Sequence, residues 1–343
     1  MKILIAGGAG FIGSTVASAC LDAGIEPVVL DNLVTGRKEY TAGRTFYEGN
    51  IADGRLIDEI FISHPDIEAV IDCAALIVVP ESVAQPLRYY TENVANGIVF
   101  LNHLARNGCR RLIFSSSASI YATADDFSVD EMSAWAPLSP YARTKALFET
   151  ALEDISSTGE MRVVSLRYFN PIGADPKMRS GLQVRNPTHA LGKMIEAYRL
   201  GETFQITGVD WPTRDGSGIR DYVHVWDLAQ AHVQALCRFD SLFETGTGSG
   251  AHTGPGSSYQ VVNLGTGIGT TVRELLDAFA DVTGKPLPVV ETARRPGDSA
   301  GAYSRGERAA VLLGWRPRHS LEEGIRDSLT WFEKRDSILG TDA

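Results

Sequence analysis

Short apolar runs alternate with longer amphipathic segments over the first half of the chain. Runs rich in β-branched residues are candidate strands, at residues 2–6, 27–31, 45–48, 69–73, 111–116 and 162–167. Segments with helical spacing lie between them, at residues 13–23, 54–63, 86–107 and 141–157. Strands of nearly continuous apolar character that alternate with helices are typical of a parallel sheet covered on both faces. The pattern therefore predicts an α/β fold built on a doubly wound parallel sheet.

The second half of the chain is less regular. Helical spacing recurs at residues 188–200, 271–283, 305–313 and 321–332, and residues 203–207 have an extended pattern. The segment 244–258 is rich in Gly, Ser and Thr, a composition that favours a flexible surface insertion over an active-site lid. We expect this half to contribute a smaller α/β lobe beside the main sheet.

Composition adds that the chain is acidic and poor in cysteine. It has 343 residues, 44% of them hydrophobic, and a formal net charge of -10. An acidic protein repels polyanions, so we expect no nucleic acid and no membrane surface as partner. The four cysteines (Cys20, Cys73, Cys109 and Cys237) lie far apart, which predicts reduced thiols and no metal site. The chain has no apolar run of membrane-spanning length and no signal-peptide core, so we expect a cytoplasmic protein.

A glycine-rich turn and an acidic residue indicate a nucleotide-binding sheet. Gly7, Gly10 and Gly13 form a GxxGxxG pattern directly after the first predicted strand. Glycines there let the backbone approach a pyrophosphate, and the N-terminus of the next helix offers unsatisfied N–H groups. Asp31 ends the second predicted strand, where a carboxylate can bind ribose hydroxyls and would repel a 2′-phosphate. The joint pattern predicts a Rossmann-type fold that binds NAD rather than NADP.

A second group of residues suits proton transfer. Tyr141 and Lys145 lie four residues apart at the start of a predicted helix, so the phenol and the ammonium share one face. The lysine cation, together with a nicotinamide cation, is expected to lower the pKa of the tyrosine from its usual value of about 10. Residues 115–117, three serines, end the fifth predicted strand at its carboxyl edge, where ligands bind in open α/β sheets. One of these serines can relay the proton of a substrate hydroxyl.

With these motifs the chain resembles the extended short-chain dehydrogenase/reductase family, and within it the epimerases of nucleotide sugars. The resemblance covers nearly the whole chain. It rests on GGAGFIG at 7–13, LDN at 30–32, PES at 80–82, PLRYY at 86–90, FSSSASIY at 114–121, SPYARTK at 139–145, LRYFNPIGADP at 166–176, GSGIRDYVHVWDLA at 216–229, NLGTG at 263–267 and RRPGD at 294–298. It implies an NAD-dependent isomerase that interconverts UDP-galactose and UDP-glucose through a 4-keto sugar.

The resemblance also implies roles for individual residues. Tyr141 would be the catalytic base, Lys145 would hold the nicotinamide ribose, and Ser117 would assist proton transfer. Contacts to NAD are implied for Gly7, Gly10, Phe11, Ile12, Gly13, Asp31, Asn32, Asn50, Ile51, Cys73, Ala74, Ala75, Asn93, Ser115, Tyr141, Lys145 and Phe169. Contacts to the UDP-sugar are implied for Ser117, Tyr141, Asn170, His189, Arg220, Arg295, Asp298 and Ala302, with the two arginines on the phosphates and Asp298 on the uridine ribose.

The same resemblance implies a domain division and a partner. An NAD-binding Rossmann domain would cover residues 1–170, with 219–265 returning to it. A UDP-sugar-binding lobe would cover residues 171–218 and 266–343. Family members pair as homodimers, and the matching helices here would be those at 86–107 and 141–157.

Four positions differ from the family pattern or bear on the choice of substrate. Ile77 stands where many relatives have a lysine over the NAD pyrophosphate, and Asn50 stands where an Asp contacts adenine. His189 falls near the family's phosphate-binding Asn, although a structural role is the plainer interpretation of a lone histidine. Ala302 is small at a position that limits the pocket beside the sugar, which leads to the hypothesis that 2-acetamido sugars are also accepted.

Other functions stay open at this point. Epimerases of UDP-arabinose, UDP-xylose or UDP-glucuronate share these motifs. A nucleotide-sugar 4,6-dehydratase is disfavoured, because residues 117–119 (Ser-Ala-Ser) lack the acidic side chains that the elimination needs. A catalytically silent, NAD-binding regulatory protein is disfavoured by the intact Ser117, Tyr141 and Lys145.

Overall fold

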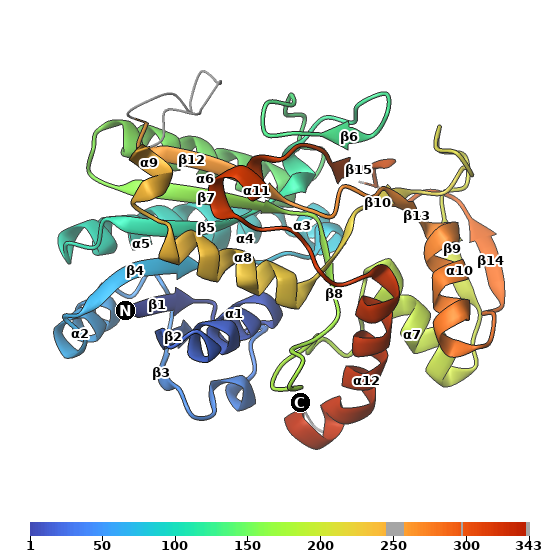
Figure 1. The fold of residues 1–343 in the computed structure, drawn as a ribbon, viewed down its shortest axis with the longest axis horizontal. Coiled ribbons are helices and arrows are strands. Elements are labelled where there is room, and N and C mark those ends of the chain that lie inside the picture. Colours follow the sequence, from blue (N-terminus) through green and yellow to red (C-terminus); the bar gives the residue numbers. More distant parts are fainter. Residues whose placement is uncertain (245–256, 296–297, 341–343) are drawn as a thin grey trace.

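A computed structural model gives the structure of the chain and describes residues 1–244, 257–295 and 298–340. Its largest element is a sheet of seven parallel strands in the order β12-β7-β5-β4-β1-β2-β3 (Figure 1). The predicted α/β fold with a doubly wound parallel sheet is confirmed. The strands are β1 (Lys2–Ala6), β2 (Glu26–Asp31), β3 (Thr45–Glu48), β4 (Ile67–Asp72), β5 (Arg111–Ser117), β7 (Arg162–Tyr168) and β12 (Tyr259–Leu264).

The strand order creates a crevice beside β1. The chain runs from β1 outward to β2 and β3, and then returns to the other side of β1 with β4, β5 and β7. Loops that leave β1 and β4 at their carboxyl ends therefore diverge in opposite directions. A ligand site in an open α/β sheet is expected at such a switch point.

Helices cover both faces of the sheet because side chains along each strand alternate between two cores. Ile3 and Ile5 pack in one core and Leu4 and Ala6 in the other. A buried Ile or Leu contributes roughly 1.5–3 kcal/mol, so the two cores hold the layers together. The first face carries α1 (Phe11–Asp22), α8 (Val225–Cys237) and α11 (Arg308–Leu313), and the second carries α2 (Gly54–Ser63), α5 (Asn96–Arg106) and α6 (Pro140–Ser157).

Two predicted helices differ most from the observed ones. The helix predicted at 86–107 consists of α4 (Pro86–Tyr90), a π-helical turn (Thr91–Ala95) and α5. The wider turn brings Asn93 inward, onto the loop that follows β4. The last helix, α12 (Leu321–Leu339), runs seven residues beyond its predicted end, because Leu339 is still buried against the second lobe.

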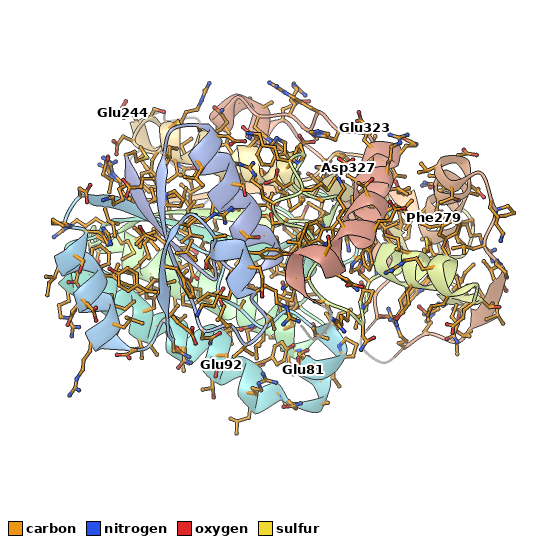
Figure 2. All side chains as sticks on the ribbon, turned by 90° about the horizontal axis from the view of Figure 1, so that it is seen from below. Glu81, Glu92, Glu244, Phe279, Glu323 and Asp327 are labelled. Atoms are coloured by element: carbon orange, nitrogen blue, oxygen red, sulfur yellow. The ribbon has the colours of Figure 1, made fainter. Side chains whose placement is uncertain are left out.

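A smaller lobe lies beside the main sheet. Helices α7 (Ala190–Leu200), α10 (Val272–Thr283) and α12 pack with the two-stranded sheet of β9 (Phe204–Thr207) and β14 (Val289–Thr292) around a third core. Figure 2 shows Phe279 among the elements of this lobe. Side chains of α11 nevertheless pack against the main sheet, so the last 78 residues, 266–343, contribute to both parts.

Short elements join the two parts of the molecule. Strands β8 and β11 pair with each other, and β13, β10, β15 and β6 form a further small sheet. Their bounds are β6 (Ser128–Val129), β8 (Asn170–Ile172), β10 (Ile219–Arg220), β11 (Tyr222–His224), β13 (Thr270–Thr271) and β15 (Gly301–Ser304); the remaining helices are α3 (Val79–Ala84), α9 (Ser241–Glu244), and the 3₁₀ turns η1 (Lys38–Thr41) and η3 (Ala118–Ile120). Within the described ranges, none of the helices has the length and hydropathy that a membrane crossing requires.

One prediction falls outside the structure. Most of the Gly/Ser/Thr-rich segment at 244–258 lies outside the described residues, since 245–256 are not among them. Whether it is a surface insertion or a lid stays a prediction.

Candidate active site

One large cavity, of about 1080 Å³, opens at the carboxyl ends of β1, β4 and β5 and is closed from the other side by the second lobe. Nearly all of the candidate site residues identified from the sequence line this cavity. Those that line it are Gly7, Gly10, Phe11, Ile12, Gly13, Asp31, Asn32, Asn50, Ile51, Cys73, Ala74, Ala75, Ser115, Ser117, Tyr141, Lys145, Phe169, Asn170, His189, Arg220, Arg295, Asp298 and Ala302. Asn93 is the one nominated residue that does not line it.

The glycine turn brings the N-terminus of α1 to the cavity. Gly7 has φ +71°, and a Cβ there would lie 2.7 Å from the backbone N of Ala74. A Cβ on Gly13 would lie 2.2 Å from the carbonyl oxygen of Gly7. A side chain at Gly7 would push the turn away from the loop after β4, and one at Gly13 would push α1 away from the turn. Gly10 caps α1 without a side-chain hydrogen bond, so the first-turn N–H groups can meet an anion.

Asp31 is placed to bind a ribose at the same end of the cavity. Its Oδ2 accepts a hydrogen bond from the Ala9 N–H at 2.9 Å, and its Oδ1 accepts one from the Leu33 N–H at 2.8 Å. Burial raises the pKa of this carboxyl, and the two backbone bonds lower it again in part. The glycine turn, the open helix end and this carboxylate fit the pyrophosphate and ribose of a dinucleotide.

Helix α6 carries the proposed catalytic pair. Ser139 caps the helix, its Oγ accepting from the Ala142 N–H at 3.1 Å, and Pro140 occupies the first turn. This start aims Tyr141 and Lys145 at the carboxyl end of β5. The Tyr141 hydroxyl lies near the Ser117 hydroxyl, and the Lys145 ammonium donates to the Ser115 carbonyl oxygen at 2.7 Å.

The pKa of Tyr141 differs from the expectation. We expected a lowered pKa, but burial raises it, and the neighbouring Ser117 hydroxyl brings it back only in part. The Lys145 ammonium does not act on the phenol here because it is held by Ser115. The protein alone therefore keeps Tyr141 protonated at neutral pH, and a further positive charge is needed to make phenolate.

Lys145 itself is buried beside a carboxyl. Burial lowers the pKa of Lys145 to about 8, an effect that the negative charge of Asp72 opposes. Burial raises the pKa of Asp72 to about 6, and Lys145 opposes that shift in turn. At neutral pH both groups are mostly charged. Asp72, the last residue of the observed strand β4, was not nominated from the sequence.

Asn93 supports the cavity wall instead of facing the cavity. Its Oδ1 accepts from the Leu76 N–H at 2.8 Å, and its Nδ2 donates to the Leu76 carbonyl at 2.9 Å and to the Thr144 hydroxyl at 3.1 Å. The side chain thus ties the loop after β4 to helix α6. The geometry therefore does not favour a direct contact between the Asn93 amide and a cofactor.

The end of the cavity away from the glycine turn is lined by two arginine side chains. Arg220 on β10 donates to the carbonyl oxygens of Ala300 and Ser299, at 2.9 and 3.2 Å, and burial lowers its pKa. Arg295 pairs with Asp298, Nε to Oδ2 at 3.0 Å. Ala302 on β15 is the register partner of Arg220 and packs against the cluster that contains Phe169.

The positions at which the chain differs from the family pattern also line the cavity. His189 caps α7, its Nδ1 accepting from the Gly192 N–H at 3.2 Å, and burial lowers its pKa to about 4. This is the structural role anticipated for it. The Asn50 Oδ1 accepts from the Ala52 N–H at 2.9 Å, which leaves its amide nitrogen for a ligand. Ile77 is 61% exposed, an apolar side chain at the cavity wall.

Further residues line the cavity that sequence reasoning did not nominate. Tyr222 follows Arg220 by two positions, so the RDY motif carried a signal for it. Gln183 lies in a segment without a recognisable motif. Glu81 and Glu92 stand on α3 and the π-helical turn along one side of the molecule (Figure 2). Over residues 1–244, 257–295 and 298–340 no group of three or more His, Cys, Asp or Glu side chains could hold a metal ion.

Comparisons with known proteins agree with this geometry. The model of the NAD dependent epimerase/dehydratase family matches residues 3–246. A UDP-glucose 4-epimerase of Rhizobium leguminosarum bv. trifolii is 38% identical over 334 residues, 97% of each chain. The crystal structure of a UDP-glucose-4-epimerase from Stenotrophomonas maltophila, with bound NAD and formylated UDP-arabinopyranose, superposes with a TM-score of 0.88 at 33% identity, over 98% of this chain and 99% of that one. The UDP-Glc/GlcNAc 4-epimerase from Campylobacter jejuni superposes with a TM-score of 0.78 at 31% identity, over 97% of this chain and 99% of that one. The chain therefore belongs to the NAD dependent epimerase/dehydratase family, alongside the UDP-glucose 4-epimerases.

Proposed function

We propose that this enzyme is an NAD-dependent isomerase that inverts the C4 hydroxyl of a UDP-hexose and so interconverts UDP-galactose and UDP-glucose. One observation carries the proposal. Ser117, Tyr141 and Lys145 meet at the carboxyl end of β5 inside a cavity that has a dinucleotide turn at one end and arginines at the other. Its relatives of nearly full length have this activity by name.

The cofactor end of the cavity is suited to NAD. The first-turn N–H groups of α1 would hold the pyrophosphate, Asp31 the adenosine ribose, and Lys145 the nicotinamide ribose. When bound, NAD supplies a reversible oxidation of the sugar carbon C4 and a positive charge beside Tyr141. The acidic Asp31 disfavours a 2′-phosphate at that ribose.

The protein's own residues move the proton. The Tyr141 phenol oxygen takes the proton of the 4-hydroxyl and returns it to the same oxygen once the sugar presents its opposite face to the cofactor. Ser117, which lies near Tyr141, would orient that hydroxyl and share the proton. Because the pKa of Tyr141 is raised by burial, the phenol becomes a base only when cationic groups surround it. The 4-keto sugar rotates within the cavity between the two proton transfers, and this rotation allows inversion of the configuration at C4.

The substrate end is suited to a diphosphate and a sugar. Arg220 and Arg295 supply positive charge in a protein whose net charge is -10, so the UDP anion is attracted locally. The Arg295–Asp298 pair would open, since Asp298 is proposed to bind the uridine ribose. Ala302 leaves space beside Phe169, which favours acceptance of 2-acetamido sugars, as named for the Campylobacter jejuni enzyme.

The domain division and the partner complete the proposal. We assign residues 1–170 and 219–265 to the NAD-binding domain and 171–218 and 266–343 to the UDP-sugar-binding lobe, from which α11 returns to pack against the main sheet. A homodimer would bury apolar side chains that are exposed on α4, α5 and α6, namely Leu87, Ile98 and Leu147. All four cysteines are free thiols, which suits a reducing cytoplasm.

Other UDP-sugar epimerases are the second candidate. The motifs and the catalytic residues are common to them, and the cavity is large enough for pentose, hexose and hexuronate substrates. The Stenotrophomonas maltophila neighbour, which carries a formylated UDP-arabinopyranose, is the specific observation in favour of a pentose. A 4,6-dehydratase is disfavoured, because residues 117–119 supply no carboxyl group beside the sugar.

One experiment separates these activities. The purified protein is incubated with UDP-galactose, without added oxidant, and the sugar is followed by NMR. We expect UDP-glucose to form until the two sugars reach equilibrium. A 6-deoxy-4-keto product would establish a dehydratase, and an unchanged substrate would reject the 4-epimerase assignment. Parallel incubations with UDP-arabinose and UDP-glucuronate test the second candidate.

A further inference from the structure

Gln183 has a buried polar atom without a partner at the wall of the cavity. In the part of the chain that the structure describes, three buried side-chain atoms lack a hydrogen-bond partner: Arg37 Nε, Gln183 Oε1 and Asn263 Nδ2. Of these residues only Gln183 lines the cavity. Its side chain is 6% exposed, so water reaches it little. A buried carbonyl oxygen without a partner costs free energy, which a ligand that donates to it would recover.

The orientation of the Gln183 amide follows from its other contact. Its Nε2 donates to the Thr35 carbonyl oxygen at 2.9 Å. Rotating the amide by half a turn would place two oxygens against each other, because a carbonyl cannot donate. Thr35 therefore leaves Oε1, an acceptor, as the end of the amide without a protein partner.

The surroundings of Gln183 belong to the proposed adenosine end of the cavity. Gly36, the residue after Thr35, lies against the Asp31 carboxylate, since a Cβ on Gly36 would be 2.6 Å from Asp31 Oδ1. On its other side Leu182 shares a small void with Phe11, the first residue of α1. Gln183 thus stands between the helix end that would hold the pyrophosphate and the carboxylate that would hold the ribose.

The chemistry of Oε1 selects among the groups of a dinucleotide. Phosphate oxygens accept hydrogen bonds and carry negative charge, so they do not satisfy a carbonyl. Ribose hydroxyls can donate to one acceptor and still receive a bond themselves. An adenosine ribose bound by Asp31 presents two such hydroxyls at this end of the cavity.

We propose that Gln183 is a cofactor-binding residue whose Oε1 accepts a hydrogen bond from an adenosine ribose hydroxyl of NAD. The inference rests on the proposed function, because it takes NAD as the cofactor. Gln183 comes from the 173–189 segment, outside the NAD-binding domain proposed above, and its Nε2 holds the Thr35 loop of that domain. The segment consequently covers the bound cofactor and slows its release.

The test measures how long the enzyme retains its cofactor. Wild type, Gln183→Leu and the control Val184→Ala are purified as holoenzymes, and exchange of bound NAD for isotopically labelled NAD is followed. Val184 is the next residue in the chain and has no side-chain polar atom. We expect Gln183→Leu to exchange NAD about five- to tenfold faster than wild type, the effect of one neutral hydrogen bond, and UDP affinity to be unchanged. Equal exchange rates in all three proteins would overturn the proposal.

A change on the ligand keeps the test independent of folding. Wild type and Gln183→Leu are loaded with NAD analogues that lack the 2′- or the 3′-hydroxyl of the adenosine ribose. If Oε1 accepts a hydrogen bond from one hydroxyl, the analogue that lacks this hydroxyl is retained for a shorter time, and the loss of retention is larger in wild type than in Gln183→Leu. Equal losses in both proteins mean that water or Asp31 alone serves this hydroxyl, and the proposal fails. A wild-type protein that takes up no NAD at all would reject the proposed function as well.

Discussion

Glu149 on α6 accepts a hydrogen bond from the hydroxyl of Ser116 on β5. This contact completes a register between the helix and the strand. Three residues spaced by four along α6 meet the three consecutive serines at the end of β5. Glu149 accepts from Ser116, Lys145 donates to Ser115, and Tyr141 lies near Ser117. The serine run therefore matches one face of a helix, and the proposed catalytic pair is positioned by its contacts along the whole face.

The buried charge of Glu149 anchors this register. Arg167 donates to it from Nη2 at 2.6 Å, and the Tyr259 hydroxyl donates at 2.9 Å. Glu149→Gln should lower the free energy of unfolding by about 3 kcal/mol or more, because Arg167 stays buried without its counter-ion. Urea unfolding measures this, with the exposed Glu160→Gln as the control. Equal losses for the two variants would contradict the anchoring role.

Tyr141→Phe should lower kcat by about two orders of magnitude or more. The variant keeps the ring and its packing but removes the group that takes the proton. UDP affinity, measured by calorimetry, should be unchanged because the arginines lie at the other end of the cavity. A variant with near-normal turnover would remove Tyr141 from the catalytic role.

Retention of NAD should depend on pH through Lys145. The pKa of its ammonium is lowered to about 8, so the positive charge is present below that pH and is lost as pH rises through it. Exchange of bound NAD should therefore be several-fold faster at pH 9.5 than at pH 7. Lys145→Met should exchange quickly at both pH values. A wild-type rate that is the same at both would show that the ammonium does not hold the cofactor.

Substrate range should depend on the size of residue 302. Ala302 packs beside the Phe169 cluster at the cavity wall, so a larger side chain would take space next to the sugar. Wild type should convert both UDP-galactose and UDP-N-acetylgalactosamine. Ala302→Leu should retain the first activity and lose most of the second. The absence of activity on the acetamido sugar in wild type would reject the hypothesis.

Acid should destabilise the protein partly through His232. This side chain is fully buried beside Tyr168, and burial lowers its pKa from 6.5 to about 4. The unfolded chain therefore binds a proton at a higher pH than the folded one, and stability is lost as pH falls from 6.5 toward 4. The loss amounts to roughly 3 kcal/mol over that range. Urea unfolding at pH 7.5 and pH 5 should show a smaller difference for His232→Gln than for wild type. An equal difference would mean that other groups account for the acid sensitivity.

Local pattern was enough to predict the parts of the fold that depend on neighbours in the chain. The strands β1 and β3 and the helix α2 have the bounds that the pattern predicts, since apolar periodicity reports which side of an element is buried. The same local character explains why GxxGxxG, Asp31 and the Tyr141–Lys145 spacing could be interpreted without a structure. The strand β12 and the helix α8 were not predicted as elements, because β12 is buried on both faces and α8 leaves only a narrow stripe, from Trp226 to Cys237, toward solvent.

The sequence by itself determined the fold class, the dinucleotide turn and the candidate catalytic side chains, because each depends on residues that are close in the chain. Only the tertiary structure decided that Asn93 supports the wall, that burial raises the pKa of Tyr141, and that Gln183 meets the Thr35 loop 148 residues away. Burial and long-range contacts depend on how distant segments pack, and packing is a property of the folded chain and of no local pattern.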